Sequence, residues 1–230
     1  MINHIISTAV KFYLRSQVEC IEDLQIKITA GDRQILKGYI PNVFLAASRA
    51  VYQGLHLGEI ELKGSNIGFN LPEVLKRKPL KLLEPILVDV KLLLEATDLE
   101  ASLSSPLLKS GLSDLWQIIL AAQGINDPQA ELVKYEINWQ TISFATQQLS
   151  LQGTYQDLDD NLTELKISTG ISLTNCHTLS LSPLTIETTA QLLPNYVNQL
   201  EIDLGTEVAI EQLTIESDKL LCCGKITINN

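Results

Sequence analysis

Apolar and polar residues alternate along much of this chain, which is the pattern of strands with one buried face. The longest run covers residues 86–94, where alternate side chains are apolar and Asp89 and Lys91 point the other way. A shorter run covers residues 24–29, and alternation dominates from residue 132 onward. These runs predict a mainly antiparallel sheet with one wet face.

Two segments near the start are less regular. Residues 35–40 are predicted to form a strand that returns after a turn at Gly31 and Asp32. Residues 46–53 predict a short helix, because Gly54 follows them as a C-cap.

Helical spacing of apolar residues marks two other segments. Residues 2–13 predict an amphipathic helix that either packs on the domain or lies on a membrane. Residues 106–122 predict a second helix, which begins with Pro106 and is apolar over most of its surface. We therefore expect this helix to be deeply covered. Before it, residues 97–100 fit a capping box at the start of a helix.

Composition favours one domain over residues 1–230. The chain has 230 residues, of which 45% are hydrophobic, so it can bury a sizeable core without disulfides. No linker or internal repeat divides it. The four cysteines have no framework spacing, and the first residues lack a secretory signal, so we expect a cytoplasmic protein.

The net charge of −10 lies entirely in the second half. Residues 1–120 carry 13 basic and 13 acidic residues, whereas residues 121–230 carry 4 and 14. An acidic half argues against nucleic acid as a partner, because binding to phosphates needs a basic face.

No motif predicts catalysis, a metal or a cofactor. Cys176-His177 and Cys222-Cys223 are adjacent pairs, which bend poorly round one zinc ion. The three histidines lie in no recognisable nucleophile context, and no glycine-rich phosphate loop occurs. We expect a protein that is not an enzyme and has no catalytic residue, no metal site and no cofactor.

One basic segment stands out in this acidic chain. Lys76, Arg77, Lys78 and Lys81 lie within six residues, and leucines flank them. Cations beside leucines suit an anionic membrane surface, since each contributes about 1 kcal/mol there. A solvated loop explains the same residues, so both interpretations stay open.

Several ordered motifs add a resemblance to a known family. They are ILKGYI at residues 35–40, SRAVYQGLHL at 48–57, KPLKLLEP at 78–85, and the pattern LxxxDL at 94–99 followed by SSPL at 104–107. Together they resemble the LmeA-like bacterial phospholipid-binding family. The resemblance covers most of residues 1–125 and includes no reactive residue.

The resemblance implies an α+β fold similar to tubular lipid-binding domains, in which a highly curved, mainly antiparallel sheet wraps a long apolar helix. It also implies binding or transfer of phospholipid, or another apolar lipid, in a cleft between helix and sheet. The lipid-cleft residues expected from the second helix are Leu108, Leu112, Leu115, Trp116 and Ile119. The basic segment would contact an anionic membrane. The protein would then be a peripheral protein at the inner face of that membrane.

Two other function classes stay open. The same apolar surfaces could be filled core in a structural or protein-interaction module, whose protein partner the sequence does not identify. An enzyme of envelope glycolipid synthesis rests on family association alone.

Overall fold

The computed structural model describes residues 18–76, 78–130, 137–156, 161–188 and 196–229. Its contacts divide the chain into two compact units, which are described separately. The first unit contains residues 1–94, 205–212 and 221–230, and the second contains residues 95–204 and 213–220. The prediction of a single domain stays a prediction. The expected helix at residues 2–13 lies outside the described residues.

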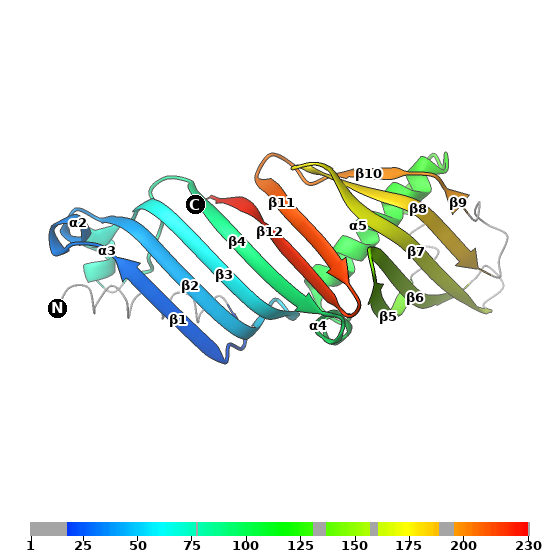
Figure 1. Cartoon of the computed structure of the whole chain (residues 1–230), viewed down its shortest axis with the longest axis horizontal. Coiled ribbons are helices and arrows are strands. Elements are labelled where there is room, and N and C mark those ends of the chain that lie inside the picture. Colours follow the sequence, from blue (N-terminus) through cyan, green and yellow to red (C-terminus); the bar gives the residue numbers. More distant parts are fainter. Residues whose placement is uncertain (1–17, 77, 131–136, 157–160, 189–195, 230) are drawn as a thin grey trace. The chain divides into compact units, whose positions relative to one another are not determined.

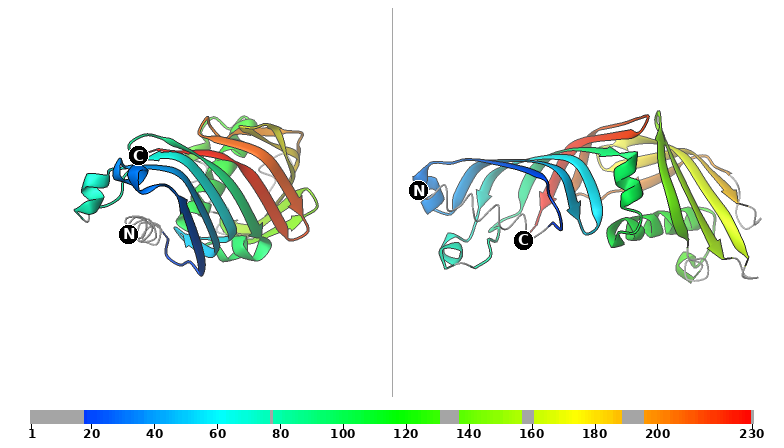
Figure 2. Two further views of the ribbon diagram at one scale, coloured as in Figure 1. Left: turned by 60° about the vertical axis from the view of Figure 1, so that its left-hand side comes forward. Right: turned by 90° about the horizontal axis from the view of Figure 1, so that it is seen from below.

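Six strands in the described part of the chain form the first sheet, in the order β1-β2-β3-β4-β12-β11 (Figure 1). The pairs β1–β2, β2–β3 and β3–β4 are antiparallel. The strands are β1 (Asp23–Thr29), β2 (Tyr39–Tyr52), β3 (Leu55–Gly68), β4 (Ile86–Glu95), β11 (Val208–Glu216) and β12 (Lys219–Ile228). The sheet curves toward the side on which the short helix α3 (Leu71–Leu75) lies (Figure 2).

The register of the first sheet separates apolar from charged side chains. One row across β1 to β4 is apolar and joins Ile26, Leu45, Leu62 and Val90. The adjacent row joins Lys27, Phe44, Lys63 and Asp89. Because side chains alternate between faces, the two rows lie on opposite faces of the sheet.

A buried cluster fills one end of the apolar side. It combines Ile35 from the helix α2 (Asp32–Leu36), Leu71 from α3 and Phe69 between β3 and α3 with strand residues such as Val88. Gly38 lets these segments meet, since its φ is +72° and a Cβ there would lie 2.6 Å from the Phe69 carbonyl oxygen.

The second unit contains a second antiparallel sheet, in the order β10-β8-β7-β6-β5, with β9 paired to β8. Its strands are β5 (Asn138–Ala145), β6 (Gln148–Gln156), β7 (Leu162–Asn175), β8 (Thr178–Thr188), β9 (Tyr196–Val197) and β10 (Leu200–Asp203). The helices α4 (Ala96–Ala101) and α5 (Pro106–Ala122) precede these strands.

The helix α5 confirms the bounds expected from the sequence. Ser105 caps it, because its hydroxyl oxygen accepts a hydrogen bond from the Leu108 amide at 3.1 Å. Pro106 stands in its first turn, where a missing N–H costs nothing.

The predicted α+β fold, with a sheet wrapped around a long apolar helix, is wrong. Strands account for 59% of the described residues and helices for 19%, and α5 is the one helix of seven or more residues among them. The helix packs through one side, and its other side exposes residues such as Leu107, Lys109 and Gly111. The sequence misled because leucines on both sides of α5 resemble a helix that is covered all round.

Three local predictions also differ from the structure. Residues 46–53 belong mainly to β2 rather than to a helix, because their pairing with β1 and β3 outweighs the helix propensity of the alanines. Residues 35–40 include the end of α2 and only the start of β2. The capping box of α4 uses Glu95 and Asp98, so it lies two residues before the predicted one.

The packing of α5 predicts a large stability effect at Ile119, which is 0% exposed. Replacing Ile119 with Ala should lower the free energy of unfolding by about 2–5 kcal/mol, because it leaves a cavity. Both tryptophans, Trp116 and Trp139, lie in the second unit, so denaturant unfolding followed by tryptophan fluorescence reports on it. The control Leu107→Ala, at a side chain 39% exposed, should cost under about 1 kcal/mol. Equal losses for the two variants would contradict this account of the packing.

Candidate functional site

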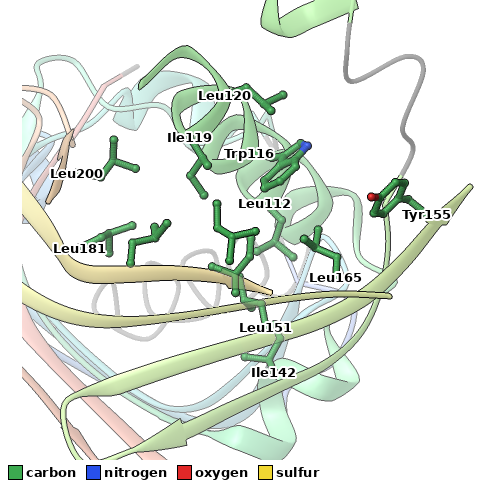
Figure 3. Close-up of a cluster of buried hydrophobic side chains, with 13 residues drawn as sticks. Leu112, Trp116, Ile119, Leu120, Ile142, Leu151, Tyr155, Leu165, Leu181 and Leu200 are labelled. Carbon is green, nitrogen blue, oxygen red and sulfur yellow. The ribbon is translucent and has the colours of Figure 1, made fainter. Parts of the chain in front are cut away.

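The predicted lipid-cleft residues of α5 face the second sheet. Leu112, Trp116 and Ile119 are buried in one apolar cluster, and Leu108 and Leu115 are partly buried against it. Figure 3 shows Trp116 and Ile119 on the side of α5 that faces the strands. The cluster partners on β5 to β8 are Ile142, Leu151, Tyr155, Leu165, Ile167, Leu181, Leu184 and Ile186. A lipid could enter here only if α5 moved away from these side chains, so the cleft stays a prediction.

The predicted membrane-contact residues lie at the α2–α3 end of the first unit. Lys76 ends α3 as its C-cap, and Lys78 and Lys81 follow it as exposed side chains. Arg77 lies outside the described residues. Glu73 forms ion pairs with Lys76 at 3.5 Å and with Lys78 at 2.5 Å, so one carboxylate offsets part of their charge.

The basic segment is fastened to the first unit by its backbone. The Asn70 side-chain amide donates to the Pro79 carbonyl oxygen at 3.1 Å, and its side-chain oxygen accepts from the Lys81 amide at 2.7 Å. Leu80 and Leu82 pack against the buried cluster of this end. The leucines therefore hold the segment while its lysines face outward.

Exposed leucines belong to the same end of the unit. Leu36, Leu75 and Leu83 are 57%, 62% and 61% exposed. Hydrogen bonds join their segments, since the Phe69 amide donates to Gly38 O at 2.8 Å and the Leu83 amide donates to Gly68 O at 3.0 Å. Arg33 of α2 and Lys37, the C-cap of this helix, are two further exposed cations. We call these residues the basic end: Arg33, Leu36, Lys37, Leu75, Lys76, Lys78, Lys81 and Leu83.

Sequence reasoning found four cations of this region and missed the contribution of α2. Arg33 and Lys37 lie about forty positions before the basic segment, and residues 35–40 read as a strand. The folded chain brings the segments together, because the Phe69 amide donates to the Gly38 carbonyl oxygen and Ile35 and Leu71 share one buried cluster. The sequence signal that could have found them is a leucine, Leu36, between two cations, Arg33 and Lys37.

The first sheet offers an apolar surface that sequence reasoning did not identify as a site. We call this surface the apolar face, and it carries Leu24, Ile26, Ile28, Val43, Leu45, Ala47, Ile60, Leu62, Val88, Val90 and Leu92. Val88 and Leu45 are buried, but Leu24, Ile60 and Leu92 are only half-buried. Apolar area therefore stays accessible away from the buried cluster.

The opposite face of the same sheet is charged and internally paired. Lys225 forms an ion pair with Asp89 at 3.5 Å and contacts Glu211, and these carboxylates raise its pKa. The Lys63 ammonium lies 5.9 Å from the centroid of the Phe44 ring. The charged face is therefore suited to contact with water. Exposure of the apolar face to water is unfavourable, so this face is the one that would bind another apolar group.

The described residues bring together no metal-binding group. No set of three or more His, Cys, Asp or Glu side chains in these ranges could hold an ion. Cys176 is an exposed thiol at the end of the β7–β8 hairpin, whereas Cys222 is half-buried in β12. In the same ranges, no helix has both the length and the apolar character needed to cross a bilayer.

Comparison with known proteins gives one family. The family model described as LmeA-like phospholipid-binding matches residues 1–225, which is nearly the whole chain. No curated protein and no solved structure matches. The match extends through the second unit, where the sequence motifs had faded.

The cysteines provide a test of local burial. Burial, and secondly the neighbouring Cys223, raises the pKa of the Cys222 thiol, so less thiolate forms near pH 8. Iodoacetamide should therefore modify the exposed Cys20 and Cys176 well before Cys222, as peptide mass spectrometry over time can measure. Unfolding in denaturant should equalise the rates. Modification of Cys222 in the folded protein as fast as Cys20 would contradict the described environment of β12.

Proposed function

The chain belongs to the LmeA-like phospholipid-binding family, and on that premise we propose that it binds phospholipid at an anionic membrane surface without transforming it. The family description specifies binding and no reaction. The protein is peripheral in this proposal, at the inner face of a membrane, and the lipid is either held or transferred.

The basic end is the observation that carries the proposal. Leu36, Leu75 and Leu83 expose more than half of their surface beside five described cations of α2 and residues 76–81. Exposed leucines of this size are poorly suited to water but can enter the boundary between head groups and acyl chains. The cations are then near the phosphates.

The energies favour reversible docking. Each cation near an anionic surface contributes about 1 kcal/mol, and Glu73 reduces the share of Lys76 and Lys78. Once a lipid leaves the bilayer, each methylene that the protein keeps from water contributes about 0.8 kcal/mol. Acyl-chain contacts therefore dominate affinity, while the basic end selects the surface.

The cleft between α5 and the second sheet stays part of the proposal as one place for the acyl chains. Leu112 and Ile119 pack in one cluster with residues of the strands, and their side chains are 7% and 0% exposed. Access for an acyl chain would therefore require α5 to separate from these strands. That close packing favours a second candidate function for this unit, a filled core in a protein-interaction module.

A binding assay tests the proposed function. Delipidated protein mixed with a phospholipid that carries a fluorescent acyl chain should raise the fluorescence as the chain leaves water. Unlabelled phospholipid should compete for the same sites. Protein that gives no increase, although it is folded by circular dichroism, would refute lipid binding and favour the interaction module.

Vesicle sedimentation tests the docking surface. Replacing Lys76, Arg77, Lys78 and Lys81 with Gln should weaken binding to anionic vesicles by about tenfold or more, because up to four attractive charges are lost. Binding by the unaltered protein should also fall as salt rises. The matched control replaces Lys27, Lys91, Lys109 and Lys219, all exposed and outside the basic end, with Gln.

The control separates local from total charge, because both variants change the net charge by the same amount. We expect the control to bind nearly as well as the unaltered protein. Equal weakening of the two variants would show that the basic end is not the docking surface.

A further inference from the structure

We propose that the acyl chains of the bound phospholipid lie on the apolar face of the first sheet, with the head group toward the basic end. This inference rests on the proposed function, and it assigns the chains to a different unit from the predicted cleft at α5. The occupant is a lipid chain rather than a second protein.

The apolar face has the dimensions that an acyl chain needs. Along β4, Val88, Val90 and Leu92 belong to this face, and the same alternation continues to Ile86 and Leu94 at the two ends of the row. Eight residue steps span about 27 Å in a strand. A chain in one leaflet reaches across about half of a 30 Å hydrocarbon core, so it fits along this row.

Exposure is greatest in the middle of this row, because Leu94 at its far end is buried like Ile86 and Val88. Near α2 and α3, Ile86 and Val88 are buried within the cluster of that end. Farther along, Val90 and Leu92 are half-buried, as are their cross-strand partners Leu62 and Ile60. The accessible part of the face is therefore continuous with the buried cluster, against which Leu80 and Leu82 of the basic segment pack.

Charge distinguishes a phospholipid from a wholly apolar occupant. The lysines at 76, 78 and 81 lie at one end of the face, and the alternating side chains within it are apolar. A molecule with an anionic head and a long apolar tail matches both parts at once. A wholly apolar partner would form no ion pairs with the lysines, and a wholly polar partner would make no apolar contacts with the face.

Neighbouring leucines of β4 give a matched pair of variants. Leu92 pairs with Ile60 on the apolar face, whereas Leu93 pairs with Glu59 on the opposite face. Both are half-buried leucines in the same strand. Leu92→Asn should weaken uptake of the fluorescent phospholipid by about tenfold, because it places an amide against the chain. Leu93→Asn should leave uptake within about twofold.

Both variants should retain binding to anionic vesicles, since neither alters the basic end. Equal uptake by Leu92→Asn and the unaltered protein would overturn the inference. That result is also expected if another part of the chain or a second protein covers the face.

Photo-crosslinking of the unaltered protein keeps the inference testable if Leu92→Asn does not fold. A phospholipid with a diazirine at the end of one acyl chain should label peptides of β1 to β4, as mass spectrometry can map. Labelling of α5 and β5–β8 instead would refute the site while supporting the proposed function. If the protein takes up no phospholipid at all, the proposed function and this inference both fail.

Discussion

The alternation of side chains along each strand, between the two faces of the sheet, is the constraint on which the first unit depends. The row Ile26–Leu45–Leu62–Val90 is apolar, and its neighbour Lys27–Phe44–Lys63–Asp89 carries the charges. A one-residue change in register would exchange the two faces. The fold therefore specifies one side for water and leaves an opposite side whose exposure is unfavourable.

The two units meet this constraint in different ways. In the second unit, α5 covers the sheet, and Ile119, Leu184 and Ile186 are fully buried. In the first unit, α2 and α3 cover one end, while Leu24, Ile60 and Leu92 remain half-buried. This difference is why we assign the acyl chains to the first sheet, where accessible apolar area is continuous with the buried cluster on which the basic segment packs.

Local rules predicted the elements whose patterns are regular. The alternation of residues 86–94 identified β4, and Pro106 with the following leucines identified α5 to the residue. The family resemblance was also correct. The fold was not, because nothing local distinguishes a helix that a sheet wraps from one that packs on a single side. The apolar face depends on the register between the consecutive strands β1 to β4, and its lower burial is visible only in three dimensions.

The most direct test of the central claim is mass spectrometry of organic extracts from freshly purified protein. We predict phospholipid in amounts comparable to the protein, enriched over a protein of similar charge prepared in parallel. Extracts without enriched phospholipid, from protein that also takes up none when it is supplied, would contradict the account.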